Sequence, residues 1–145
     1  MLTDYSRIVV AYDHSALSKK ALKMAMNLAK QDKIIELYVV MVQQPLRPAP
    51  YSYGYVYVSA QEAQREEIQA IRKDLEEELN SLQNKTGTVL LEGNPGQMIV
   101  DYVRQNDADL VVMGSRGLSG LKELFLGSVS HYVVQKATCP VLIVK

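Results

Sequence analysis

With 145 residues, the chain is long enough for one domain with a substantial buried core, and its 48% hydrophobic and 22% charged content is ordinary for a globular protein. Its 16 basic and 16 acidic side chains balance, which argues against a protein that binds nucleic acid or an anionic membrane. The lone cysteine, Cys139, excludes an internal disulfide and a cysteine-rich zinc site. The absence of an apolar leader and of any membrane-length apolar run predicts a cytosolic protein.

The first half of the chain alternates between strand and helix patterns. Residues 7–12 are a short β-branched run typical of a buried strand. Ser15 then precedes apolar residues at helical spacing and is the expected N-cap of a first helix. Residues 34–42 predict a second strand. A capping box at residues 59–62 predicts the start of a long second helix, whose apolar stripe is formed by Ile68, Ile71, Leu75, Leu79 and Leu82.

Between the second strand and this helix, residues 43–59 follow neither pattern. The segment contains three prolines and then tyrosines at every second position, from Tyr51 to Tyr57. In an extended chain these tyrosines would share one side. We expect a long surface loop with a short extended piece. The alternative is that the segment acts as a lid or as a contact for a partner.

The second half of the chain continues the alternation. Residues 88–92 predict a third strand, and Asn94-Pro95 predicts the capped start of a third helix. Residues 109–113 predict a fourth strand, residues 128–137 a last helix, and residues 141–144 a fifth strand. Strands that are apolar on both faces and alternate with helices predict a single-domain α/β fold, with a parallel sheet covered by helices on both faces.

The richest motif follows the fourth strand, where residues 114–130 read GSRGLSGLKELFLGSVS and contain four of the eight glycines. Bare backbone can approach a ligand closely, and successive amides can form an anion nest. Ser128 and Ser130 open a helix whose positive end favours phosphate, and Arg116 can add a bidentate charge. The pattern favours a phosphate cradle. The alternative is that the glycines only make turns and that Ser128 is only an N-cap.

In an open parallel sheet, ligands bind beyond the carboxyl ends of the strands. We therefore expect Asp13, after the first strand, to converge with Gly114, after the fourth. The chain has no G-x-x-x-x-G-K-[ST] motif, no G-x-G-x-x-G motif after its first strand and no G-x-S-x-G motif. The usual nucleotide and nucleophile fingerprints are therefore absent.

The glycine spacing is similar to that of a known family. Gly114, two residues, Gly117, nine residues and Gly127-Ser128 match the G-2x-G-9x-G-[ST] motif of the ATP-binding branch of the universal stress protein family. The resemblance extends over essentially the whole chain, 1–145. It includes residues 9–13, 37–40, 108–117 and 139–144.

The resemblance implies a Rossmann-like domain with strand order 3-2-1-4-5 that binds ATP, with Mg²⁺ or Mn²⁺ as a possible companion. In that arrangement the backbone at Ala11 and Val39 would hold adenine, and Asp13 would lie near the ribose or a phosphate-bound metal. The residues expected around the ribose and phosphates are Gly114, Ser115, Arg116, Gly117, Gly127, Ser128, Val129 and Ser130. Two positions depart from the family pattern, His14 where glycine is common and Met41 where an acid is common.

Three functions were compared on these residues. The motif favours a nucleotide-binding regulatory protein with little or no ATP hydrolysis, because Asp13 is the only acid placed near the cradle. The alternative is a hydrolase or transferase on a related adenosine-binding fold, but residues 11–15 read AYDHS and lack the catalytic signatures of those enzymes. A nucleotide-free dimerisation module is disfavoured by the intact motif.

Three further side chains have ordinary interpretations. His14 is expected to be a polar loop residue with a possible nucleotide contact, His131 a helical surface residue, and Cys139 a small core residue. The final strand, residues 141–144, is short, apolar and at the sheet edge in the implied order. We therefore expect a homodimer built on this strand.

Overall fold

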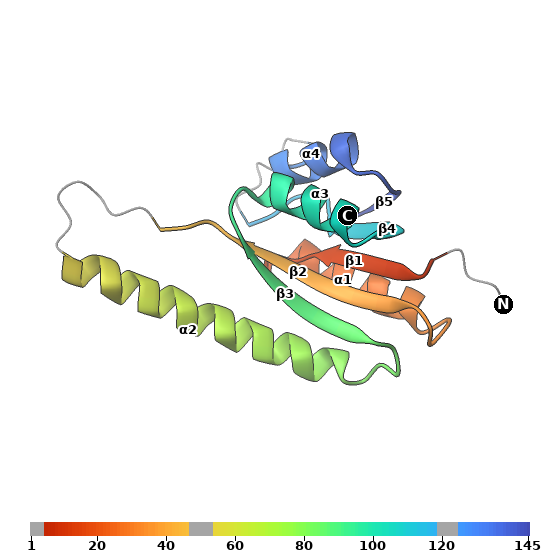
Figure 1. Cartoon of the computed structure of the whole chain (residues 1–145), viewed down its shortest axis with the longest axis horizontal. Coiled ribbons are helices and arrows are strands. Elements are labelled where there is room, and N and C mark those ends of the chain that lie inside the picture. The colour runs from red at the N-terminus through yellow and green to blue at the C-terminus, as the bar shows by residue number, and fades with distance from the viewer. Residues whose placement is uncertain (1–4, 47–53, 119–124) are drawn as a thin grey trace.

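The computed structural model describes residues 5–46, 54–118 and 125–145. Strands and helices alternate along the chain (Figure 1). The elements are β1 (Arg7–Ala11), α1 (Ala16–Ala29), β2 (Glu36–Gln43), α2 (Gly54–Leu79), β3 (Thr86–Glu92), α3 (Pro95–Gln105), β4 (Leu110–Gly114), α4 (Ser128–Lys136) and β5 (Val141–Val144).

All five strands form one sheet in the order β3-β2-β1-β4-β5, and every neighbouring pair is parallel. This confirms the predicted single-domain α/β fold and its strand order. The chain fills the sheet outward from β1 in one direction (β2, then β3) and then in the other (β4, then β5), so the strand order reverses between β1 and β4. The carboxyl ends of β1 and β4 therefore lie together at the reversal, where open α/β sheets bind ligands.

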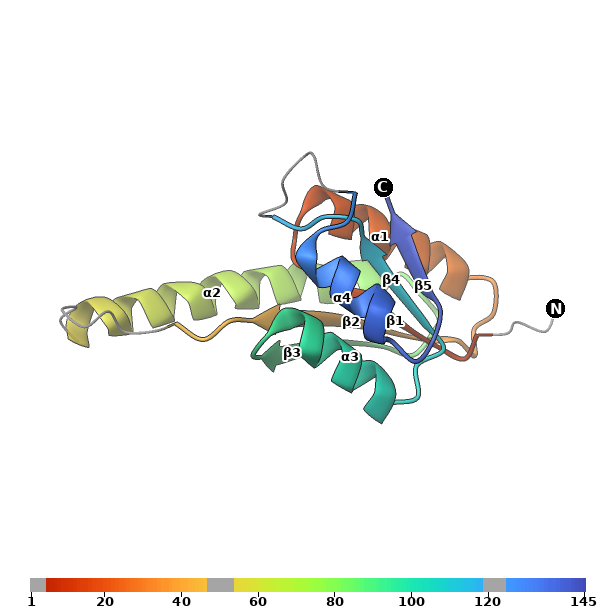
Figure 2. The ribbon, with the colours of Figure 1, turned by 90° about the horizontal axis from the view of Figure 1, so that it is seen from above.

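Helices cover both faces of the sheet, and each face has its own apolar cluster. One cluster joins alternate strand residues, such as Ile8 and Val10, to α1 and the C-terminal part of α2. The other joins Val9 and Ala11 to α3 and α4. Figure 1 shows α3 and α4 on one side of the sheet and α2 on the other, and Figure 2 gives the view turned by 90°. The period-2 alternation of the strands decides which residues face each helix pair.

Two helices begin where the sequence predicts. The Ser15 hydroxyl accepts the Ser18 N–H at 3.2 Å and caps α1. The Asn94 side chain accepts the Gln97 N–H at 3.1 Å, and Pro95 is the first residue of α3. The last helix also begins at the predicted residue, Ser128, and its N-cap is Gly127, so the alternative reading of Ser128 as the N-cap is wrong.

The prediction for residues 43–59 was wrong in part. Gln43 still belongs to β2, and α2 begins at Gly54, so residues 59–62 lie inside the helix. Tyr57 is helical: its hydroxyl donates to the Leu46 carbonyl at 3.4 Å and accepts from the Gln61 side chain, one helical turn on, at 3.0 Å. The helix therefore includes residues 55–58, whose sequence YVYV has a local propensity for a strand. Tyr51 and Tyr53 lie outside the described residues.

Only the C-terminal part of α2 packs on the body of the protein. Leu75 and Leu79 are buried, whereas Val56 and Val58 are about half exposed. Both views show the N-terminal half of α2 projecting beyond the sheet (Figures 1 and 2). In the described ranges, no helix combines the length and apolar character that a membrane crossing requires.

Candidate functional site

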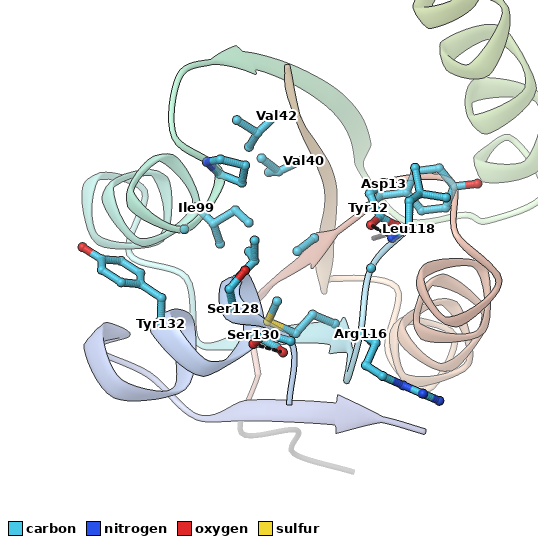
Figure 3. A pocket seen from close by; sticks show the side chains of 18 of the residues that line it. Tyr12, Asp13, Val40, Val42, Ile99, Arg116, Leu118, Ser128, Ser130 and Tyr132 are labelled. Carbon is cyan, nitrogen blue, oxygen red and sulfur yellow. Dashed lines mark hydrogen bonds between the residues drawn. The ribbon is translucent and has the colours of Figure 1, made fainter. Parts of the chain in front are cut away.

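A cavity of about 620 Å³ opens at the carboxyl ends of β1, β2 and β4, on the face that carries α3 and α4. Its walls come from the ends of these strands, the N-termini of α3 and α4, and the segment that follows β4 (Figure 3). The first turn of a helix leaves N–H groups without intrahelical acceptors, so two positive helix ends border one space.

The structure brings most of the predicted site residues together in this cavity. Those that line it are Ala11, Asp13, Gly114, Arg116, Gly117, Gly127, Ser128, Val129 and Ser130. Two predicted residues, Val39 and Ser115, do not line it. The convergence of Asp13 with the glycine-rich segment joins stretches of the chain about a hundred residues apart.

The position of Val39 follows from strand parity. Its side chain is fully buried in the cluster under α1 and α2, on the face opposite the cavity. The next residue, Val40, points to the α3 and α4 face and lines the cavity. The prediction for Val39 concerned its backbone, which the direction of its side chain does not test. Val40, opposite Ala11 in the paired strand, supplies the side chain on the cavity face.

One end of the cavity is apolar. Val40, Val42 and Ile99 lie together there, and Met113 and Pro95 add to the walls (Figure 3). These residues, together with Gln44, Asn94, Gly96, Leu118 and Tyr132, were not predicted for the site. A flat aromatic group can be desolvated at this end, while the opposite end offers amides and hydroxyls.

The polar end is built around the carbonyl of Ser115. This oxygen accepts the Gly127 N–H at 2.7 Å and the Ser130 hydroxyl at 2.9 Å, and the same hydroxyl lies 3.1 Å from the Gly127 carbonyl. Ser115 and Ser130 are both buried, so these bonds satisfy polar groups that water does not reach. The two serines therefore fix the start of α4 against the end of β4, and exposed Ser128 presents its hydroxyl at the cavity.

The three described glycines of the motif have different physical reasons. A Cβ on Gly114 would lie 2.7 Å from the Leu17 Cβ, and a Cβ on Gly117 would lie 2.5 Å from Oδ2 of Asp13. At both positions an atom would have to move: beside Gly114 it is the Cβ and backbone of Leu17 in α1, whereas beside Gly117 it is the carboxylate at the end of the Asp13 side chain. A Cβ on Gly127 would be 3.4 Å from its nearest neighbour, the Arg116 Cα, which is ordinary van der Waals contact.

Backbone conformation does not require glycine at position 127 either. Its φ of −67° and ψ of 166° suit any residue, and Gly93 is the only described glycine with a left-handed φ. The protein itself therefore tolerates a side chain at Gly127. Gly127 borders the cavity directly before the first N–H groups of α4.

Arg116 lines the cavity, but its guanidinium points away from the cavity in Figure 3. The structure therefore brings the residue to the site without aiming its charge at the space that a phosphate would occupy. The cavity is also lined by one negatively charged side chain among the described residues, Asp13. Its carboxylate accepts N–H groups from Ser15 and Leu118.

The remaining candidate side chains lie outside the cavity walls. His14 has a left-handed φ of 66°, a conformation in which glycine is unstrained, and its Nδ1 lies 3.2 Å from the Tyr12 hydroxyl. His131 is exposed on α4. Burial raises the pKa of the Cys139 thiol, which keeps it neutral and unreactive near pH 7. No group of three His, Cys, Asp or Glu suited to hold a metal occurs among the described residues.

Comparison with known proteins gives a consistent result. The model of the universal stress protein family matches residues 4–145. The universal stress protein Sll1388 of Synechocystis sp. is 37% identical, over 97% of this chain and 98% of its own length.

Two solved structures show the same fold. The Methanocaldococcus jannaschii protein MJ0577 is 26% identical with a TM-score of 0.83, over 99% of this chain and 97% of its own. A universal stress protein family protein of Arabidopsis thaliana, solved with AMP bound, is 18% identical with a TM-score of 0.70, over 97% of this chain and 91% of its own.

Proposed function

This chain belongs to the universal stress protein family, a family of stress-response proteins, and on that premise we propose that it binds ATP in the cavity between β1 and β4. The whole chain, 1–145, would act as one nucleotide-binding domain of the family's ATP-binding branch. Its role would be regulatory and cytoplasmic, with nucleotide occupancy changing its conformation or its binding partners, and with little or no hydrolysis.

The proposal depends on Gly127, a glycine that neither its backbone conformation nor its described neighbours require. Neither the backbone conformation nor the neighbouring atoms exclude a side chain there, yet the residue borders the cavity at the start of α4. A missing side chain beside free helical N–H groups is the arrangement that lets phosphate oxygens approach a backbone. The cavity volume of about 620 Å³ is also in the range of sites for nucleotide-sized ligands.

The chemistry of the walls suggests how ATP would lie. The apolar end formed by Val40, Val42 and Ile99 suits the adenine base, close to the backbone of Ala11. Asp13 and residues 114–117 would border the ribose. The phosphates would meet the N–H groups of Ser128, Val129 and Ser130, where the helix dipole favours negative charge.

Little hydrolysis is proposed because the site offers few groups for it. Among the described lining residues Asp13 is the only acid, no histidine is present, and both Asp13 oxygens accept backbone N–H groups. Efficient phosphoryl transfer needs a positioned base or water-orienting side chain and a firmly held metal ion. A Mg²⁺ or Mn²⁺ ion would enter with the phosphates and take most of its ligands from them and from water.

We also propose a homodimer through β5. In the described sheet, β5 pairs only with β4, so its other edge offers free N–H and C=O groups, and Leu142 is 37% exposed. The strand contains neither proline nor charge within residues 141–144 to discourage pairing. A two-fold axis beside β5 would pair it with its own copy and close the edge.

Isothermal titration tests the nucleotide proposal directly. Purified protein is titrated with Mg-ATP, and then with ADP and AMP to rank the phosphate contribution; AMP is included because the Arabidopsis protein binds it. A saturable one-to-one site for ATP is expected. No heat change and no competition with a fluorescent ATP analogue at millimolar concentration would refute the proposal.

A further inference from the structure

The segment after β4 is tied to the turn after β1 by one carboxylate. Oδ2 of Asp13 accepts the Leu118 N–H at 3.2 Å, and Oδ1 accepts the Ser15 N–H at 3.0 Å. Asp13 and Leu118 are 105 residues apart in the chain, and both line the cavity. Figure 3 shows the two side by side at one wall of the cavity. Asp13 thus joins two otherwise separate pieces of that wall.

The same carboxylate explains the glycine at position 117. A Cβ there would lie 2.5 Å from Oδ2 of Asp13 and 3.7 Å from its Cγ, and these are its contacts within 4 Å among the described residues. The φ of Gly117 is not in the left-handed region, so its backbone conformation would suit other residues. With glycine at this position the Asp13 carboxylate can stay where it accepts the Leu118 N–H, and a Cβ would force it to move.

We propose that Asp13 is a positioning residue whose carboxylate latches residues 117–118 beside the cavity and thereby slows the departure of bound nucleotide. This inference rests on the proposed ATP site. Leu118 lines the cavity while exposing 76% of its surface, which places it at the cavity mouth. An N–H bond to a carboxylate is stronger than one to a neutral acceptor, so it can hold an exposed segment in place. Glycine at 117 lets the carboxylate come close enough to make that bond.

The latch predicts how Gly117→Ala depends on the size and on the charge of the side chain at position 13, and the two can be tested separately. Gly117→Ala is placed in three backgrounds: the parent, Asp13→Ala and Asp13→Asn. Asp13→Ala removes both atoms that a Cβ at 117 would approach, whereas Asp13→Asn keeps a side chain of the same size and loses the charge. Gly117→Ala should therefore be harmful in the parent and in Asp13→Asn, and nearly silent in Asp13→Ala.

Two measurements are made on every variant. The first is the dissociation rate of a fluorescent ATP analogue, chased with excess ATP. Gly117→Ala in the parent, and Asp13→Ala alone, should each raise this rate about fivefold, equivalent to roughly 1 kcal/mol, while the association rate stays within about twofold. Adding Gly117→Ala to Asp13→Ala should change the dissociation rate by less than about twofold. A merely structural defect would not confine its effect to dissociation.

The second measurement is the unfolding midpoint without nucleotide, which does not depend on the proposed function. If the parent binds no ATP, the ATP proposal fails together with the effect on nucleotide departure, and the midpoints then decide only whether Asp13 holds residues 117–118: rescue by Asp13→Ala but not by Asp13→Asn supports that tie. A Gly117→Ala penalty that is the same in all three backgrounds overturns the latch. So does a Gly117→Ala variant that behaves as the parent does.

Discussion

Replacing Gly127 by alanine should abolish or strongly weaken ATP binding and leave the fold intact. The added methyl group would sit 3.4 Å from the Arg116 Cα, 3.5 Å from the Ser115 carbonyl oxygen and 3.7 Å from the Ser130 hydroxyl, so no neighbour has to move. Gly127 borders the cavity directly before the first N–H groups of α4, where the phosphates are proposed to lie, so the methyl group would stand at that border.

The two free energies can be estimated separately. Alanine is a poorer N-cap than glycine, which costs roughly 0.5–1 kcal/mol, but it restricts the unfolded chain and recovers about 0.4–1 kcal/mol. The net change in unfolding free energy should stay within about 0.5 kcal/mol, or roughly 2 °C in unfolding midpoint for a domain of this size. For binding, a methyl group that keeps phosphate off the helix amides should cost at least about 1.4 kcal/mol, a tenfold loss of affinity.

The assay is isothermal titration of parent and variant with Mg-ATP, together with thermal unfolding of both without nucleotide. Gly87→Ala is the matched control, because Gly87 lies in β3 away from the cavity walls and its methyl group would meet, among the described residues, the Tyr38 ring at 3.1 Å. The control should keep full affinity. A folded Gly127→Ala variant that binds ATP as tightly as the parent would refute the reasoning. A large loss of stability would also refute it, because it would show that the fold needs this glycine. Gly127→Val should abolish binding altogether.

Three other properties can be tested independently. ATP turnover should stay well below about 1 s⁻¹, and a release of phosphate at that rate or faster in a coupled assay would favour the enzyme alternative. Light scattering should give twice the 16.2 kDa chain mass, with at least one of Ile143→Pro and Leu142→Lys shifted toward monomer; a monomeric parent at micromolar concentration would contradict the β5 dimer. The Ser6 hydroxyl, which donates to Asp109, lowers the pKa of that carboxyl, and the Ser6 and Arg7 N–H groups act in the same direction. A lowered pKa stabilises the fold at pH values above the unfolded pKa of about 3.9, and that contribution is lost as the pH falls through the folded value. Asp109→Asn should therefore cost roughly 1 kcal/mol in urea unfolding at pH 7 and progressively less as the pH falls below the unfolded value; a difference that does not depend on pH would contradict this assignment.

Local patterns in the sequence were sufficient for much of the fold. The β-branched runs, the caps at Ser15 and Asn94 and the last strand at residues 141–144 all appear in the structure, because each depends on residues a few positions apart. The parallel sheet followed from the alternation of apolar strands with helices. The strand order came from the family resemblance, since no local pattern states which strands are neighbours.

The start of α2 and the choice of site valine depended on contacts that no local pattern contains. The helix begins at Gly54, against the strand propensity of residues 55–58, and inside it Tyr57 bonds both to Leu46 and to Gln61. Val40 rather than Val39 faces the cavity because the register of β2 against β1 sets the face of every residue in the strand.

The glycine motif shows the same division most clearly. The sequence alone determined that residues 114–130 contain unusually bare backbone next to a strand end, and that Asp13 should meet it. Only the tertiary structure assigned separate reasons to the individual glycines. Gly114 makes room for Leu17 of α1, and Gly117 makes room for the Asp13 carboxylate. At Gly127 a Cβ would meet its nearest described neighbours at ordinary van der Waals distances, from 3.4 Å, and the residue borders a cavity whose walls come from separate stretches of the chain.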